Sequence, residues 1–345
     1  MATSGGRRDL DEFADGFGRW LRARRPELSD PRIESVTHPS AGLSNETIIV
    51  TLHGGDRLVV RLPPLLASFP ETTLSAQAVV HAVVSAAGIP TAAPVVVEES
   101  DEWLGAPFVV MPFVEGHIPG PASLFDRWIV DAPEADQRHI QEQMIHVLAD
   151  VHRIDWRGTA TSTVLRGAGA GLRDEIGWWV DYVRWAADGD APDRLVDLLD
   201  WCSTTCPATE PEPSLVWGDA RLENLMFDDR LCVVAVLDWE LATIGPAELD
   251  LGWYLALERA LFEMVGGTRT VPGFRDRDEL IGIYQARLGR PVQDLAWHEI
   301  FSLVRSLCIT FRQARISRIA GVDYPVPELD GNPMLDVVDR WISRF

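Results

Sequence analysis

The first third of the chain combines a helical pattern with several strand patterns. Apolar residues recur at helical spacing over residues 10–24, and polar and apolar residues alternate over 47–62, on either side of Gly54 and Gly55. Two adjacent glycines between alternating runs are typical of a hairpin turn. The patterns predict two helices, at 10–24 and 73–87, and strands at 33–39, 47–53, 57–62, 94–98 and 107–113.

Helical patterns dominate from residue 115 onward. They predict helices at 133–154, 172–187, 192–202, 247–265, 275–288, 292–319 and 333–343. A short β-rich segment, residues 214–239, interrupts them. A small β-rich lobe joined to a larger helical lobe is an α+β arrangement, and the cleft between two such lobes is where ligands bind.

Charge and composition exclude several classes of function. Acidic residues outnumber basic ones 52 to 31, and the formal charge of −21 would repel nucleic acid and anionic membranes, so neither is an expected partner. All 31 basic residues are arginine, which removes Schiff-base chemistry and the Gly-Lys-Ser/Thr phosphate loop. The 4 cysteines are too few for a disulfide scaffold, and the amino terminus lacks the apolar segment of a secretory signal. These features predict a cytoplasmic protein.

The β-rich segment carries carboxylate and amide side chains at a spacing that suits phosphoryl transfer. Asp219 and Asn224 lie in a loop that enters an apolar strand, and Asp238 ends the next apolar strand. Phosphoryl transfer needs a carboxylate that accepts the proton of the attacking hydroxyl, and oxygen ligands that hold Mg²⁺ on the nucleotide phosphates. This spacing supplies both. Taken alone, the same three residues would also serve to cap turns and a helix.

These residues resemble those of the aminoglycoside phosphotransferase and choline kinase group, which is related to the protein kinases. The catalytic loop of that group usually reads His-Gly-Asp-x4-Asn; here residues 217–224 read Trp-Gly-Asp-x4-Asn and residues 237–240 read Leu-Asp-Trp-Glu. Within this group, the sequence resembles a bacterial branch of phosphotransferases, which is related to the kinase domains fused to animal acyl-CoA dehydrogenases. The resemblance implies a bilobal protein-kinase-like fold, with Asp219 as catalytic base and with Asn224 and Asp238 as magnesium ligands.

The resemblance also implies roles for residues around this loop. Asp250 is expected to brace the catalytic loop, and His152 is expected to be a packed helix residue rather than a catalyst. Glu240 is a candidate for a second metal ion or for a capping role. Trp217 replaces the usual histidine, which leaves open the hydrogen bond that this histidine makes behind the loop.

The N-terminal lobe is expected to bind the nucleotide. By resemblance, residues 39–46 take the place of the glycine-rich phosphate loop, Arg61 replaces the phosphate-binding lysine, and Gln77 replaces the helix glutamate that anchors this lysine. An adenine-binding hinge is expected at about 111–116. The implied contacts to ATP or GTP are Ser40, Gly42, Ser44, Asn45, Arg61, the carbonyl of Pro112 and the N–H of Val114. Without the resemblance, Arg61 reads as a surface strand residue and residues 39–46 as an ordinary turn.

The expected organisation is an N-terminal helix at 1–30, a β-rich nucleotide-binding lobe at 31–114 and a helical lobe at 115–345. The expected activity is that of an Mg²⁺-dependent kinase that phosphorylates a hydroxyl of a small molecule. Two alternatives stay open: a catalytically inactive nucleotide-binding protein, favoured by Arg61 and Gln77, and a kinase for hydroxyacyl compounds rather than aminoglycosides. One helical face carries Trp178, Tyr182 and Trp185, either as core or as the wall of an apolar acceptor pocket.

Overall fold

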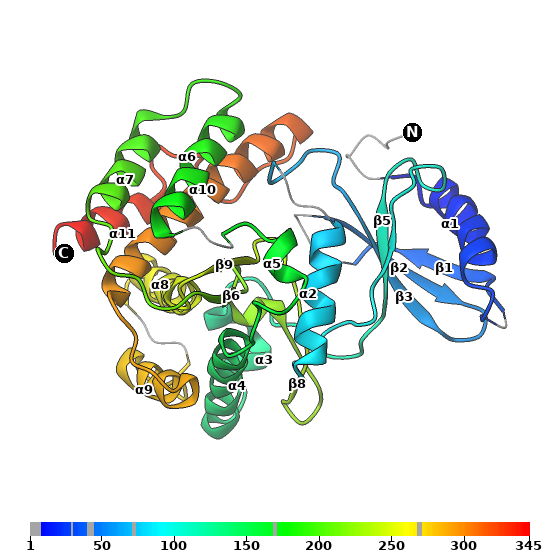
Figure 1. Cartoon of the computed structure of the whole chain (residues 1–345), viewed down its shortest axis with the longest axis horizontal. Helices are drawn as coiled ribbons and strands as arrows, with labels where there is room; N and C mark the ends of the chain where they lie inside the picture. The colour runs from blue at the N-terminus through cyan, green and yellow to red at the C-terminus, as the bar shows by residue number, and fades with distance from the viewer. Residues whose placement is uncertain (1–7, 29, 40–44, 71–73, 168–170, 268–270) are drawn as a thin grey trace.

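The chain folds into two lobes in the computed structural model (Figure 1), which describes all residues except 1–7, 29, 40–44, 71–73, 168–170 and 268–270. The N-terminal lobe is built on a five-stranded antiparallel sheet of order β1-β2-β3-β5-β4. Its strands are β1 Ile33–Thr37, β2 Glu46–Leu52, β3 Arg57–Leu62, β4 Val96–Glu98 and β5 Phe108–Pro112.

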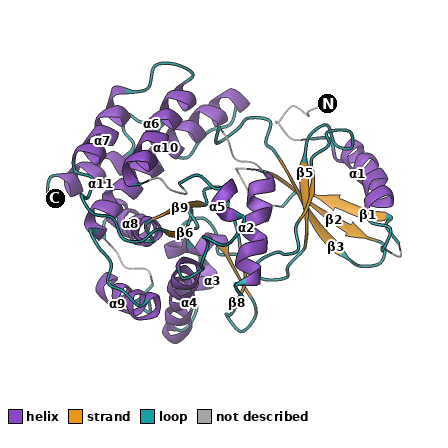
Figure 2. Cartoon of the chain, viewed as in Figure 1, coloured by secondary structure: helices purple, strands orange, loops and turns teal. Residues whose placement is uncertain are grey.

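Two helices cover the two faces of this sheet (Figure 2). Helix α1, Leu10–Arg24, begins at Asp9, whose side chain accepts hydrogen bonds from two N–H groups of the first turn. The apolar side chains of α1 pack on alternate residues of β2, β3 and β5. Helix α2, Leu74–Ala86, covers the other face and lies between the sheet and the C-terminal lobe. The N-terminal helix therefore shares the core of the sheet.

The C-terminal lobe is mainly helical. Its helices are α3 Arg127–Val130, α4 Glu134–His152, α5 Thr161–Val164, α6 Leu172–Ala187, α7 Asp193–Thr204, α8 Glu248–Met264, α9 Arg277–Leu288, α10 Leu295–Ala320 and α11 Pro333–Ile342. Two small antiparallel pairs lie among them: β6 Ser214–Val216 with β9 Thr243–Gly245, and β7 Leu225–Phe227 with β8 Val233–Val236. The α+β fold with two lobes, predicted from the patterns, is confirmed.

The segment that follows β3 in the N-terminal lobe forms hydrogen bonds with the C-terminal lobe. After β3 the chain crosses to α6 and α10 (Figure 1), where Arg312 Nε and Nη2 donate to Ala67 O at 3.0 and 2.8 Å. The hydroxyl of Tyr182 donates to Ser68 O at 3.0 Å. Tyr182 is buried, and its ring lies 5.6 and 5.7 Å from those of Trp178 and Trp185. The predicted shared face therefore exists, and Tyr182 serves there as core.

None of the helices in the described part of the chain is both long and apolar enough to cross a membrane.

Candidate active site

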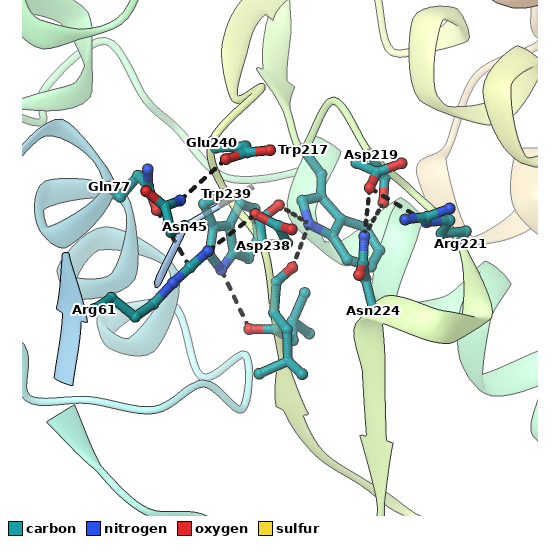
Figure 3. Close-up of polar contacts among 12 residues, drawn as sticks. Asn45, Arg61, Gln77, Trp217, Asp219, Arg221, Asn224, Asp238, Trp239 and Glu240 are labelled. Atoms are coloured by element: carbon teal, nitrogen blue, oxygen red, sulfur yellow. Dashed lines mark hydrogen bonds and ion pairs between the residues drawn. The ribbon is translucent and has the colours of Figure 1, made fainter. Parts of the chain in front are cut away.

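The catalytic loop predicted at 217–224 follows β6 and leads into β7. Asp219 is its central carboxylate, and only 14% of its side chain is exposed. Asn224 Nδ2 donates to Asp219 Oδ2 at 2.8 Å and to Asp219 O at 2.9 Å. Trp253 Nε1, from α8, donates to Asp219 Oδ1 at 3.1 Å. The loop and α8 thus hold both oxygens of the carboxylate in place (Figure 3 shows the pair Asp219 and Asn224).

Asp250, on the first turn of α8, holds the backbone of this loop. It is fully buried, and its two oxygens accept the N–H groups of Trp217 at 2.6 Å and Gly218 at 2.7 Å. His152 Nε2 lies 2.9 Å from Asp250 Oδ2, and His152 Nδ1 lies 2.6 Å from the hydroxyl of Tyr284. The predicted brace is confirmed, as is the prediction that His152 is a packed helix residue.

Gly218 adopts a conformation that only glycine accepts readily. Its φ is +94°, and a Cβ at this position would overlap the carbonyl oxygen of Leu241. The close approach brings the catalytic loop against the turn that contains Leu241, directly after the predicted metal-binding residues 238–240 (the metal segment). A glycine directly before Asp219 is therefore a requirement of this geometry.

Arg305 is a fully buried cation behind the loop, and the sequence patterns did not identify it. Its Nη2 donates to Gly218 O at 3.1 Å. Its guanidinium lies 4.8 Å from the ring of Trp253 and 5.3 Å from that of Trp179. Burial lowers the pKa of Arg305 from its usual range. The available signal was an arginine on the apolar side of a predicted helix, which favours a buried, paired role.

Trp217, which stands in place of the usual histidine, connects the catalytic loop to the metal segment. It is fully buried, and its Nε1 donates to Leu237 O at 2.8 Å and to Asp238 O at 3.2 Å (Figure 3). Its ring lies 5.6 Å from that of Trp239. The indole of Trp217 thus donates hydrogen bonds behind the loop, which answers the question raised by the missing histidine.

Asp238 lies between this indole and the N-terminal lobe (Figure 3). Its φ is +58°, a left-handed conformation that aspartate tolerates better than most residues. Its Oδ1 is buried and accepts no hydrogen bond from the residues that the structure describes. Arg61 Nη2 lies 3.6 Å from that oxygen. Burial raises the pKa of Asp238, and the nearby charge of Asp219 raises it further.

These oxygens fit a divalent cation. Hard cations prefer carboxylate and amide oxygens, and Mg²⁺ is usually held by one or two carboxylates together with phosphates and water. Asp238 offers a carboxylate oxygen without a hydrogen bond, and both bonds of Asn224 to Asp219 use its Nδ2, which leaves its amide oxygen for a cation. No group of three His, Cys, Asp or Glu side chains suited to a metal occurs in the described ranges. Phosphate oxygens or water would complete the ligands of a cation here.

Two predicted nucleotide contacts meet the metal segment. Arg61, on β3, donates from Nη1 to Gln77 Oε1 on α2 at 3.4 Å, besides facing Asp238. Asn45 Nδ2 donates to Glu240 Oε2 at 3.1 Å (Figure 3). Ser40, Gly42 and Ser44 lie outside the described residues. The sequence predicted the contact of Arg61 with Gln77 but not its second partner, Asp238.

The hinge residues lie at the end of β5. Pro112 pairs with Leu58 in the sheet, and the N–H of Phe113 donates to Arg57 O at 3.0 Å. Val114 follows this last sheet bond and packs against the apolar cluster beneath α2. Pro112 and Val114 thus lie together at the end of β5, where the chain leaves the N-terminal lobe.

Arg221 is a further site residue that the sequence patterns did not identify. Its Nε lies 3.2 Å from Asp219 Oδ2, and 46% of its side chain is exposed. The neighbouring Asp219 carboxylate raises the pKa of Arg221. A partly exposed arginine is therefore held beside the carboxylate of Asp219. Its position two residues after the predicted base was the available signal.

Solved structures share this architecture. A protein of Ralstonia eutropha, provisionally described as an aminoglycoside phosphotransferase, superposes with a TM-score of 0.73 at 23% identity, covering 98% of this chain and 99% of its own. A thermostable mutant of the aminoglycoside phosphotransferase APH(4)-Ia, in complex with AMP-PNP and hygromycin B, gives a TM-score of 0.59 at 15% identity, covering 95% and 99%. A macrolide 2'-phosphotransferase of type I gives 0.54 at 21% identity, covering 88% and 92%.

Animal proteins share part of the sequence. The acyl-CoA dehydrogenase family member 11 of Homo sapiens is 29% identical over 291 residues, which are 80% of this chain and 34% of the human protein. Family member 10 of Mus musculus is 26% identical over 283 residues, 78% of this chain and 25% of its own length. The chain therefore spans about a third of the human relative and a quarter of the mouse relative.

The family assignment rests on a longer match. The sequence model of the phosphotransferase enzyme family matches residues 35–287, which is well over half of the chain and includes the catalytic loop, the metal segment and the brace. The resemblance inferred from residues 217–224 and 237–240 is thereby confirmed. The chain belongs to the phosphotransferase enzyme family.

Proposed function

We propose that this protein is a small-molecule kinase that transfers the γ-phosphate of ATP or GTP to a substrate hydroxyl. The observation that carries the proposal is the convergence of Asp219, Asn224 and Asp238 at one site, facing Arg61 from the other lobe. Asp219 accepts the proton of the substrate hydroxyl while the hydroxyl oxygen forms a bond to the γ-phosphorus. The bond from this phosphorus to its bridging oxygen breaks, and the nucleoside diphosphate leaves.

Asn224 and Asp238 would hold Mg²⁺ together with the phosphates. The bound ion would neutralise charge that develops on the phosphate oxygens. The support is the buried Asp238 oxygen, which accepts no hydrogen bond from the described residues, and the amide oxygen of Asn224, which its bonds to Asp219 do not use. The contact of Glu240 with Asn45 favours a structural role for Glu240 before nucleotide binds, and a second ion at Glu240 remains a prediction.

The nucleotide would lie between the lobes. Arg61 and Asn45 would contact its phosphates, together with Ser40, Gly42 and Ser44, which lie outside the described residues. The Pro112 carbonyl and the Val114 N–H would contact its base. The related fold of APH(4)-Ia binds AMP-PNP together with hygromycin B, which supports a nucleotide and a hydroxylated small molecule as the two ligands.

The acceptor distinguishes two versions of this proposal. Fold neighbours named for aminoglycosides favour an aminoglycoside. Sequence relatives named for acyl-CoA dehydrogenases favour a hydroxyacyl compound. Because Tyr182 is buried and bonded to Ser68, it does not serve as the central wall of an aromatic acceptor pocket. A cytoplasmic location stays a prediction.

A transfer assay tests the proposal. Purified protein is supplied with labelled ATP or GTP, Mg²⁺ and two panels of acceptors, aminoglycosides and hydroxyacyl compounds, with a chelator as the metal-free arm. We expect transfer to one panel, and we expect Asp219→Asn to lower turnover by about 10²–10⁴-fold, because a general base contributes roughly that factor. The matched control is Asp229→Asn, which changes an exposed carboxylate in the turn between β7 and β8.

Each outcome has a defined meaning. Transfer by Asp219→Asn at the parent rate would remove Asp219 from the role of base. Nucleotide binding without transfer to any acceptor would favour the inactive nucleotide-binding protein, for which the departures at Arg61 and Gln77 are the supporting observation.

A further inference from the structure

The carboxylate of Asp219 is held from two directions, by its own loop and by α8. Within the loop, Asn224 donates to Oδ2 at 2.8 Å, and Arg221 Nε lies 3.2 Å from the same oxygen. Trp253 lies on α8, 34 residues farther along the chain, and donates to Oδ1 at 3.1 Å. With a donor on each oxygen, the carboxylate has little freedom to rotate, because rotation would break both bonds. The loop residues Asn224 and Arg221 both contact Oδ2, whereas the hydrogen bond to Oδ1 comes from α8.

One helix positions both the backbone and the side chain at this point. Asp250 and Trp253 are three residues apart on α8 and therefore share a face. Asp250 accepts the N–H groups of Trp217 and Gly218, while Trp253 donates to the carboxylate of Asp219. The first turns of α8 thus fix both the backbone position of the loop and the orientation of the Asp219 carboxylate.

The ring of Trp253 is itself held from behind. Trp253 is buried, and the guanidinium of Arg305, on α10, lies 4.8 Å from its ring. The same guanidinium donates to Gly218 O, next to Asp219. Residue 252 is a glycine because a Cβ there would lie 2.9 Å from the carbonyl carbon of His298, so α8 and α10 approach closely at this level. The indole therefore has a defined position when no substrate is bound.

We infer that Trp253 is a positioning residue for the base: its N–H fixes the Asp219 carboxylate in the orientation that accepts the proton of the acceptor hydroxyl. The inference rests on the proposed function, since it assumes that Asp219 is the base. Trp253 lies on α8 of the C-terminal lobe and donates to the base, whereas the predicted nucleotide ligands Arg61 and Pro112 lie on β3 and β5 of the other lobe. Its loss should therefore lower kcat and leave the KM for nucleotide unchanged.

The chain contains a matched control at a distance from the site. Trp341, on α11, is also buried, and its Nε1 donates to Glu263 Oε1 at the same distance of 3.1 Å. The guanidinium of Arg259 lies 4.1 Å from its ring. Trp341 thus has the same set of partners, a carboxylate on the indole nitrogen and an arginine on the ring. Trp341→Phe measures what this arrangement contributes to stability alone.

The test uses Trp253→Phe, which keeps an aromatic ring and removes the N–H. We expect kcat to fall about ten- to hundredfold, the factor that corresponds to one hydrogen bond to a charged group. We expect the KM for nucleotide to stay at the parent value and Trp341→Phe to keep the parent kcat. In an Asp219→Asn background, adding Trp253→Phe should cause no further loss, because the group that Trp253 positions is already absent.

A second measurement does not depend on activity. The protein has 13 tryptophans, and ¹⁵N-labelling of tryptophan gives one indole N–H signal for each, with that of Trp253 assigned by its absence from Trp253→Phe. We expect this signal to shift in Asp219→Asn, where the charged acceptor is lost, and the signal of Trp341 to stay in place.

The outcomes separate the inference from the proposed function. A parent enzyme without any transfer activity counts against the proposed function, and the indole signal still reports the contact. An active parent with Trp253→Phe at the parent kcat, or an indole signal that does not respond to Asp219→Asn, overturns the inference. So does an equal fall in kcat for Trp253→Phe and Trp341→Phe, since that would reflect stability only.

Discussion

The two sides of the candidate site are held in different ways. On the C-terminal side, Asp250 is fully buried and binds the catalytic loop with hydrogen bonds of 2.6 and 2.7 Å. Trp217 and Arg305, also fully buried, add bonds of 2.8 and 3.1 Å. On the N-terminal side, Arg61 reaches Gln77 at 3.4 Å and Asp238 at 3.6 Å.

This difference matches the work expected of each side. A base and metal ligands act best when they are fixed before the substrate arrives, because no energy is then spent on reorienting them. A phosphate-binding cation needs to exchange its partners for the nucleotide. Long contacts to a neutral amide and to a carboxylate that we propose as a metal ligand are suited to such an exchange. We expect substitutions on the C-terminal side to affect turnover, and those on the N-terminal side to affect nucleotide binding.

Gly218→Ala should have the largest effect of the remaining substitutions. The new Cβ would both require a left-handed conformation, at about 1–2 kcal/mol, and overlap the carbonyl oxygen of Leu241. The loop would have to move, and displacement of a catalytic group by about 1 Å lowers turnover by roughly 10²-fold. Steady-state kinetics would measure the fall in kcat, and thermal unfolding would measure the change in stability.

Gly88→Ala is the control that separates strain from overlap. Gly88 has a similar φ of +85°, but a Cβ there would meet no atom within 4 Å. It should lose stability from strain alone and keep the parent kcat. Equal turnover in the two variants would show that the catalytic loop is less rigid than the comparison of the two sides implies.

Much of the fold could be predicted because its elements are long and periodic. Helices α1 and α6 begin and end where the apolar spacing placed them, at Leu10–Arg24 and Leu172–Ala187. Strand β9 and the helices α3 and α5 were missed, since three or four residues are too few to show a period and tertiary contacts decide their conformation. Strand β9, for example, exists because it pairs with β6.

The site follows the same rule. Asp219, Asn224 and Asp238 could be predicted because they lie close together in the sequence, around two short strands. Trp253 and Arg305 could not, since their roles depend on helices that return to the loop from 34 and 87 residues away. The sequence thus identified the side chains expected to meet the substrate, and the structure identified those that hold them in place.

Arg61→Ala should weaken nucleotide binding more than it changes the chemistry of the bound complex. It removes a guanidinium from a position 3.6 Å from Asp238, where the phosphates are expected. The loss of one bond to a charged group, about 1.5–3 kcal/mol, corresponds to a fall of roughly ten- to hundredfold in kcat/KM for nucleotide. Arg127→Ala, on an exposed ion pair of the C-terminal lobe, is the control. Parent-like kinetics for Arg61→Ala would mean that the phosphate contact lies elsewhere.

Gln77→Glu should have the smallest effect and is the sharpest test of why this position is neutral. Gln77 is buried and accepts one long hydrogen bond from Arg61. A carboxylate in its place would form an ion pair with the guanidinium and compete with the nucleotide for it. We expect the KM for nucleotide to rise roughly three- to tenfold, which corresponds to about 0.7–1.4 kcal/mol, with kcat nearly unchanged.

Gln77→Leu is the matched variant, because it keeps the volume and removes the acceptor. It should leave the KM for nucleotide at the parent value or lower it, since Arg61 then has one partner fewer to leave. Opposite directions for Glu and Leu would establish that Arg61 is held loosely so that phosphate can capture it. A lower KM in Gln77→Glu would mean instead that Arg61 needs a charged anchor, and the contrast between a fixed catalytic loop and an exchangeable cation would no longer hold.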